Sequence, residues 1–216
     1  LSKSMIYGKH KYAIIVDGEN GIDTPMNLLF SNQSLLSYVD PFKNSNYQTL
    51  YNLLIHERSV FYSNYGEFQK PGINYLLQNG YIEVSELGYL RIKDVHKVEV
   101  LKKLYNEGEI SYYHCEPKER KVIETFVAAG WLKYDEYLLS PNERHFINFY
   151  LNNAEYSNGY QLRNKYSHGV TPNCEGDKNE HQTAYYYFLM IFVIILLKMD
   201  VDFQLARHYV KRCNQA

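Results

Sequence analysis

The pattern of hydrophobic and polar positions divides the chain into helical segments and a few short strands. Apolar residues recur at helical spacing over residues 27–65, 71–79, 95–106, 141–162 and 179–199. Strict alternation is confined to residues 81–84 and 89–92, and residues 12–16 form a short apolar run of strand type. Because helical periodicity dominates, we predict a mainly α fold with small β elements.

Local signals place several element boundaries. The pair Asp40-Pro41 interrupts the first helical region, and Pro71 and Gly80 are typical of the first turn and the end of a helix. Ser140-Pro141-Asn142-Glu143 has the order of a capping serine, a first-turn proline and an acid three residues after the serine. We therefore expect helices to begin near residues 71 and 141.

An internal repeat organises the middle of the chain. Residues 73–82 align with residues 123–132 at a shift of 50, and Tyr89 aligns with Tyr137 at a shift of 48. Helix, glycine, strand, turn and strand is the outline of a winged helix. We predict an N-terminal lead and helix over 1–39, two winged-helix-like units over 40–140 (about 40–94 and 95–140, the second with a shorter wing), and a helical domain over 141–216.

The would-be recognition helices carry little positive charge. Residues 71–79 contain no lysine or arginine, and the second helix has three basic residues offset by three glutamates: Lys118, Arg120, Lys121, Glu116, Glu119 and Glu124. Groove-reading helices normally use basic residues to neutralise phosphates. The pattern therefore favours scaffolding or protein docking for these units.

Composition narrows the function classes. The net charge is −1 and the pI is near 6.8, so any contact with nucleic acid must be local. Three widely spaced cysteines and the absence of a secretory leader favour a cytoplasmic protein with no structural metal. Since the sequence begins with Leu1, we expect further residues to precede it.

An apolar run near the C-terminus lacks any charge. It covers residues 184–197 and is shorter than the roughly 20 residues that span a bilayer, so we expect no membrane segment. We predict a helix buried on nearly every side, either in the domain core or against a second copy. Asp200 and Asp202 are expected to interrupt it before a separate closing helix.

The chemistry-bearing stretch is residues 162–169, Leu-Arg-Asn-Lys-Tyr-Ser-His-Gly. Arg163 could hold a phosphate and His168 could move a proton near neutral pH. On an unbroken helix, Asn164 and His168 share a face, whereas Arg163 and His168 point about 140° apart. A working site therefore needs a break in the helix or a second chain.

This stretch, with an apolar helix on each side, resembles the Arg-polar-x3-His signature of HEPN domains, and the resemblance covers about residues 140–216. It implies a HEPN-like helical bundle and a metal-independent, cofactor-free endoribonuclease, of the kind found in toxins and phage-defence effectors. It further implies an RNA substrate, a homodimer through the C-terminal helices, and an antitoxin or activator protein as partner. Arg163, Asn164 and His168 would be catalytic, and Tyr160, Lys165 and Tyr166 would bind substrate.

Two alternatives remain open. Arg163 could interact with a helix C-terminus, where a cation is favourable, while His168 and Gly169 merely end that helix. The chain could also be a non-catalytic winged-helix and HEPN-like regulator or assembly module that binds nucleic acid or a protein.

Overall fold

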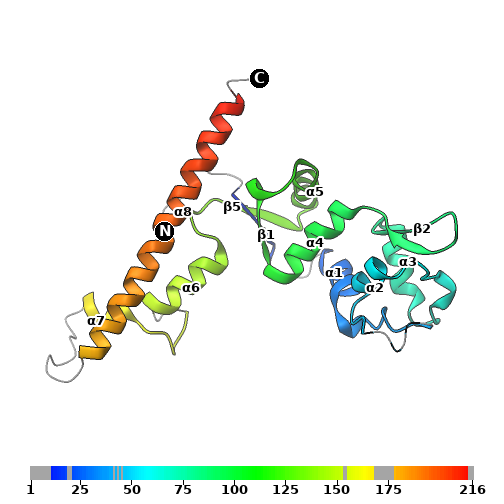
Figure 1. The fold of residues 1–216 in the computed structure, drawn as a ribbon, viewed down its shortest axis with the longest axis horizontal. Helices are drawn as coiled ribbons and strands as arrows, with labels where there is room; N and C mark the ends of the chain where they lie inside the picture. The colour runs from blue at the N-terminus through cyan, green and yellow to red at the C-terminus, as the bar shows by residue number, and fades with distance from the viewer. Residues whose placement is uncertain are drawn as a thin grey trace. The chain divides into compact units, whose positions relative to one another are not determined.

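The computed structural model describes residues 11–18, 21–40, 42, 44, 46–152, 155–167 and 178–213. These residues are mainly helical and include two small sheets, as the periodicity predicts (Figure 1). The chain divides into one unit of Ala13–Tyr134 and another of Asp135–Ala216 with Leu1–Tyr12. The finer partition into 1–39, 40–140 and 141–216 stays a prediction.

The first unit contains short helices around one apolar core. Its α-helices are α1 (Asp23–Phe30), α2 (Leu50–His56), α3 (Lys70–Gln78), α4 (Val95–Glu107) and α5 (Pro117–Ala128). Its 3-10 helices are η1 (Asn32–Ser34), η2 (Tyr62–Asn64) and η3 (Tyr112–His114), and its strands are β1 (Tyr12–Ile15), β2 (Ile82–Val84), β3 (Leu90–Ile92), β4 (Glu109–Ser111) and β5 (Leu132–Asp135). Fully buried side chains from α1 to α5, such as Leu29, Leu50, Ile73, Leu104 and Ile123, form the core.

The β2–β3 hairpin confirms the predicted pair of alternating runs. The strands are antiparallel, with Ile82 opposite Ile92 and Val84 opposite Leu90. Ile82 and Leu90 are buried, whereas Val84 is exposed. The hairpin therefore contributes one apolar face to the core, as antiparallel pairs commonly do.

The internal repeat extends further than the sequence alignment, over residues 50–84 and 100–134. In order, α2, η2, α3 and β2 of the first copy correspond to α4, η3, α5 and β5 of the second at a shift of 50. Both copies end the longer helix in the same way: Tyr81 N donates to Leu76 O at 3.0 Å, and Trp131 N donates to Phe126 O at 2.9 Å.

Side-chain hydrogen bonds repeat at the same shift. The Tyr62 hydroxyl donates to Asn74 Oδ1 at 2.9 Å, and the Tyr112 hydroxyl donates to Glu124 Oε1 at 2.5 Å. Likewise, Gln69 and Glu119 each accept a backbone N–H from the residue three positions earlier, both at 3.0 Å. Since few residue identities survive between the copies, these shared bonds and the shared apolar positions are what maintain the common geometry.

The two copies differ in the origin of the third strand. In the first copy, β3 lies between β2 and residues 60–61: Leu90 N donates to Val60 O at 2.7 Å, and Phe61 bridges Tyr89. In the second copy, β1 from the N-terminal region lies between β4 and β5 (Figure 1). After β5 the chain turns, with Asp135 Oδ1 accepting from Tyr137 N at 2.9 Å. The third strand of the second copy is thus supplied from the start of the chain, and its shorter wing stays a prediction.

Gly130→Ala is expected to lower the free energy of unfolding by about 1 kcal/mol. Gly130 has φ +76°, and a Cβ added there would meet nothing within 4 Å, so the cost is purely conformational. Urea denaturation followed by circular dichroism measures it. Gly66→Ala is the control, because its Cβ would make only ordinary contacts; equal stability of Gly130→Ala and wild type would contradict the expectation.

The second unit contains α6 (Pro141–Leu151), α7 (Leu162–Ser167) and α8 (Lys178–Cys213). The predicted start of α6 is confirmed: Ser140 Oγ accepts from Glu143 N at 3.3 Å, and Glu143 Oε2 accepts from Ser140 N at 3.0 Å. The sequence predicts that this helix runs towards Leu162, with an interruption at Ser157-Asn158-Gly159 as an alternative. The unbroken continuation is wrong, because α6 ends at Leu151 and a turn at Gly159 precedes α7.

The predicted interruption of the last helix is also wrong. Helix α8 runs through Asp200 and Asp202 without a break. Asp202 is buried and pairs with Lys11 at 2.7 Å, while exposed Asp200 accepts from Gln204 Nε2 at 2.6 Å one turn later. Both carboxylates are therefore accommodated without ending the helix.

Helix α8 is less covered within the chain than expected. Ala184 and Ile191 are buried, and Ile191 packs with Leu139 and Ile147 in a small core. The exposed large apolar residues of α8 are Tyr185, Tyr186, Phe188, Phe192, Val193, Leu196, Leu197, Met199 and Phe203. Burial on nearly every side therefore does not occur among the described residues, and packing against a second copy stays a prediction. Among the described residues, no helix has both the length and the apolar character needed to cross a bilayer.

Candidate functional site

A tight turn between α6 and α7 positions the chemistry-bearing stretch. Tyr160 N donates to Phe149 O at 3.0 Å, and Gly159 N donates to Tyr156 O at 3.2 Å. A Cβ on Gly159 would lie 2.5 Å from Phe149 O, so only glycine allows this approach. Gln161 then has a φ of +54° and accepts from Lys165 N at 3.0 Å, which begins α7.

Aromatic side chains hold this turn against α8. The ring of Tyr160 stacks on Tyr150 with centroids 5.3 Å apart and planes 10° apart, and its centroid is 4.6 Å from that of Tyr187. The Tyr187 hydroxyl donates to the Tyr160 hydroxyl at 3.0 Å. Hydrogen bonding to Tyr160 raises the pKa of Tyr187. One face of the predicted stacking residue Tyr160 is thus already engaged inside the protein.

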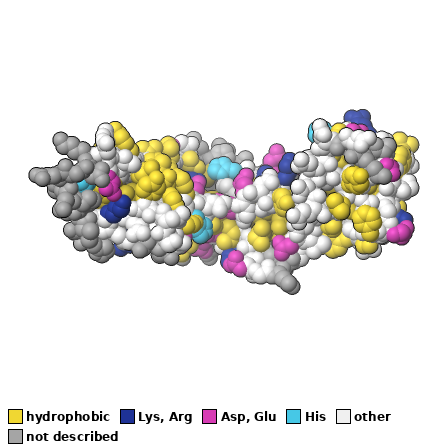
Figure 2. Space-filling view, turned by 90° about the horizontal axis from the view of Figure 1, so that it is seen from below, with side chains coloured by type: hydrophobic (Ala, Val, Ile, Leu, Met, Phe, Trp, Pro, Cys, Tyr) yellow, Lys and Arg dark blue, Asp and Glu magenta, His cyan; other side chains and the backbone are white. Residues whose placement is uncertain are grey.

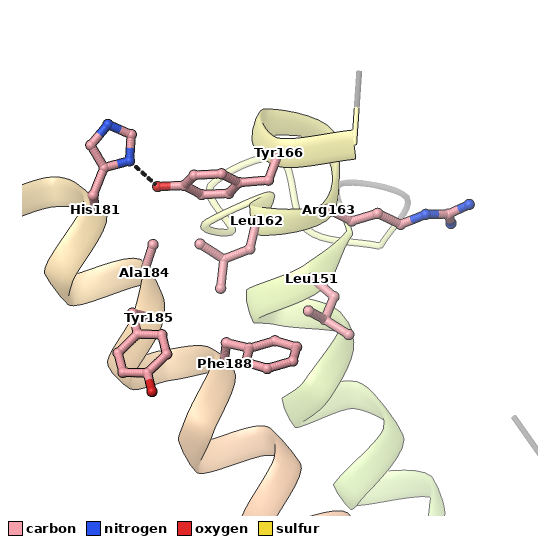
Figure 3. A pocket seen from close by; sticks show the side chains of 8 residues that line it. All are labelled: Leu151, Leu162, Arg163, Tyr166, His181, Ala184, Tyr185 and Phe188. Atoms are coloured by element: carbon pink, nitrogen blue, oxygen red, sulfur yellow. Dashed lines mark hydrogen bonds between the residues drawn. The ribbon is translucent and has the colours of Figure 1, made fainter. Parts of the chain in front are cut away.

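Two polar contacts tether α7 to the first turn of α8. Lys165 Nζ lies 2.8 Å from Glu180 Oε1. The Tyr166 hydroxyl and His181 Nδ1 are hydrogen-bonded at 2.9 Å, and their rings contact each other edge to face (Figure 3). The contacts are one residue apart on both helices, so together they define which faces of α7 and α8 meet.

Arg163 differs from three cations of α6, α7 and α8 that lie in ion pairs. Lys165, Arg144 and Lys198 pair with Glu180, Asp135 and Glu143 at 2.6–2.8 Å. Arg163 is exposed, and among the described residues it has no ion pair or hydrogen bond. Its guanidinium extends away from the neighbouring cavity (Figure 3). Within the described part of the chain, α7 therefore presents an arginine without a counter-charge.

The remaining predicted site residues are placed as follows. Asn164 lies next to Arg163 on α7 and is half-buried. Lys165 and Tyr166 are on the same short helix, and both contact α8. His168 lies outside the described residues. The structure thus brings five of the six predicted site residues together around α7 and says nothing of the sixth.

A cavity of about 500 Å³ opens beside α7. It is lined by Leu151, Leu162, Arg163, Tyr166, His181, Ala184, Tyr185 and Phe188 (Figure 3). Its walls are mostly rings and aliphatic groups from α6, α7 and α8, and Figure 2 shows apolar side chains gathered over this unit. Polar groups are confined to Arg163, the two tyrosine hydroxyls and the His181 ring.

A second hollow of about 290 Å³ shares Leu162, Tyr166 and Ala184 with the first. Its polar lining includes Lys165 and Glu180, which neutralise each other. It is therefore a poorer site for an anion than the side of α7 that carries Arg163.

His181 is a site residue that sequence reasoning missed. It is 15 residues from Tyr166, and no spacing rule for helices or strands connects the two. Its only signal was that a histidine stands in the first turns of the helix after the motif. Packing of α7 on α8 is what joins this second titratable ring to the motif.

Elsewhere the structure offers little metal-binding chemistry. Burial raises the pKa of the Cys115 thiol to about 11, so it stays protonated at neutral pH. Its neighbour His114 shares a hydrogen bond with Ser111 Oγ at 2.7 Å. Within the described part of the chain, no three His, Cys, Asp or Glu side chains group as metal ligands would.

Comparison with protein-family models, with curated proteins and with solved structures finds no match to this chain. Its function therefore has to be inferred from the side chains of α6, α7 and α8.

Proposed function

We propose that the chain is a metal-independent endoribonuclease of HEPN type. The observation that carries the proposal is Arg163, an exposed arginine without a carboxylate partner among the described residues, on a helix that leads directly to His168. Leaving a cation un-neutralised while its neighbours are paired suits a group that binds an external anion. An RNA phosphate is such an anion, and an arginine fork binds phosphate in a bidentate manner.

The side chains of Arg163, Asn164 and His168 suit one cleavage reaction. The RNA 2'-oxygen would attack the adjacent phosphorus while the bond from phosphorus to the 5'-oxygen breaks, which leaves a cyclic phosphate and a free 5'-hydroxyl. His168 would accept the proton of the 2'-hydroxyl or donate one to the departing oxygen. Arg163 would stabilise the negative charge that builds up on the phosphoryl oxygens. Asn164 would orient the histidine or the phosphate.

The predicted substrate-binding residues would act at the edges of this site. Tyr166 is exposed at the mouth of the cavity and could contact a base. Tyr160 retains partial exposure despite its ring stacking. Lys165 would attract phosphate only weakly, because Glu180 already neutralises it.

A homodimer through α8 would complete the enzyme. Tyr185 and Phe188 line the cavity, and the other exposed apolar residues of α8 are each 38–61% accessible. Since an aromatic side chain can bury 150–250 Å², together these other residues would remove on the order of 700 Å² per chain from water, close to the size of a standard interface. Two proton transfers need two groups, and a dimer could bring two copies of His168 to one phosphate. Such an enzyme would suit a toxin or phage-defence effector held in check or activated by a partner protein.

A second candidate function is a non-catalytic regulator or assembly module. It is favoured by two exposed apolar side chains within the predicted unit of residues 40–94, Phe68 at 74% and Leu87 at 76% exposure. Helix α3 carries a single basic residue, Lys70, whose ammonium pairs with the Glu67 carboxylate at 2.5 Å. If its units are winged-helix-like, this charge pattern would favour binding to a protein over binding to a nucleic-acid groove.

The test is cleavage of a defined single-stranded RNA by the purified chain in EDTA. We expect cuts that leave a 2',3'-cyclic phosphate and a 5'-hydroxyl, and we expect a 2'-deoxy substitution at the cut position to abolish that cut. Intact RNA, or cleavage that is indifferent to the 2'-deoxy substitution, would refute the nuclease proposal.

A further inference from the structure

The cavity beside α7 has the dimensions and walls of a small-molecule site. Its volume of about 500 Å³ lies within the usual range for such sites. Two of its rings, Tyr185 and Phe188, are each 57% exposed, so the cavity is open to solvent. A ligand with flat apolar faces would cover surface that otherwise faces water.

The polar groups of the cavity include the Tyr166 hydroxyl and the His181 ring. The hydroxyl and His181 Nδ1 are bonded to each other, and the other nitrogen of the ring points away from the remaining lining residues (Figure 3). A neutral imidazole offers one donor and one acceptor. Nucleobases combine stackable faces with edges that both donate and accept, whereas an acyl chain would have no use for these groups.

Arg163 adds a condition on the ligand. It belongs to the cavity lining, yet its guanidinium extends away from the cavity, and it lacks a carboxylate partner among the described residues (Figure 3). A ligand that fits both features has an apolar planar part inside and an anionic part outside. A nucleotide within an RNA strand has this arrangement, because its phosphate is separated from its base by the ribose.

We infer that this cavity is a nucleobase subsite that receives one unstacked base of an RNA strand while Arg163 holds a phosphate of that nucleotide. Tyr166, Tyr185 and Phe188 supply ring contacts, and the Tyr166 hydroxyl contacts the base edge. The inference deepens the proposed nuclease function and rests on it for the identity of the strand. Its consequence is a base preference next to the cleaved phosphate.

Binding of nucleoside 5'-monophosphates to the intact chain tests the subsite without requiring cleavage. Isothermal titration should show at least one of the four mononucleotides binding about tenfold more tightly than ribose 5-phosphate, which has no base. Ala184→Phe should fill the cavity and remove most of that advantage, while binding of ribose 5-phosphate stays unchanged. Arg163→Ala should weaken both ligands.

Phe188→Ala is a second variant in case Ala184→Phe does not fold. Phe192→Ala is its matched control, because Phe192 stacks parallel to Phe188 one turn along α8 but does not line the cavity. The subsite is refuted if ribose 5-phosphate binds as well as every mononucleotide, if the Phe188 and Phe192 variants bind mononucleotides equally, or if decanoate binds and mononucleotides do not. Cleavage of RNA without mononucleotide binding would refute the subsite and support the nuclease proposal. Mononucleotide binding without cleavage would support the subsite and refute the nuclease proposal.

Discussion

Asp202→Asn is expected to lower the free energy of unfolding by about 3–5 kcal/mol. Asp202 lies 2.7 Å from Lys11 Nζ, and the two side chains are only 4% and 6% exposed. The Lys11 ammonium also donates to Leu138 O at 2.8 Å. Neutralising the carboxylate would leave a buried ammonium without its counter-charge, and water cannot reach it to compensate.

Chemical denaturation in guanidinium chloride measures this loss. Asp200→Asn is the matched control, since Asp200 is two residues away on the same helix, exposed, and bonded only to nearby Gln204 among the described residues; its effect should stay below about 0.5 kcal/mol. Replacing both members of the buried pair, as Lys11→Met with Asp202→Leu, should restore most of the stability. Equal denaturation midpoints for the two single variants would show that the buried pair contributes nothing.

Arg163→Ala is expected to lower kcat/KM for RNA cleavage by about 10²–10³-fold, because it removes the charge proposed to stabilise the phosphoryl transition state. His168→Ala should lower it by about 10²–10⁴-fold, the usual contribution of a positioned acid or base. Arg163→Ala should not reduce stability by more than a surface substitution does, since Arg163 is exposed and has no carboxylate partner among the described residues.

Single-turnover cleavage of a fluorescently labelled RNA, together with circular dichroism of each variant, measures both effects. Arg207→Ala is the control: it removes the same side chain from an exposed position on α8, about 39 Å along the helix from His181. Cleavage by Arg163→Ala and His168→Ala at the rate of Arg207→Ala, with the fold intact, would contradict the assignment of the site.

Local signals predicted much of the secondary structure. The Ser140 cap, Pro71 and Pro141 in first turns, and Gly80 after α3 all stand where the sequence placed them. The β2–β3 hairpin was visible in its alternation. These features depend on neighbours within a few residues, so sequence reading can find them. The helix over residues 141–162 was overextended, because the turn at Gly159 depends on how Tyr160 meets Phe149.

Pairings between residues far apart in the sequence could not be predicted from local patterns. Lys11 and Asp202 are distant in sequence, yet the lysine neutralises this buried carboxylate of α8. In the same way, β1 completes the sheet of the second repeat copy. Nothing in the amino-acid sequence of residues 12–15 identifies their partner strands.

The sequence by itself determined the helical class, the repeat and the candidate site residues at 163–168, because periodicity, caps and residue type are local properties. The tertiary structure decided which of these residues remain available. It neutralised Lys165 with Glu180, joined Tyr166 to His181, and left Arg163 exposed beside an open cavity. The reason is that a charge is free or paired only through what another helix brings near it, and that depends on packing.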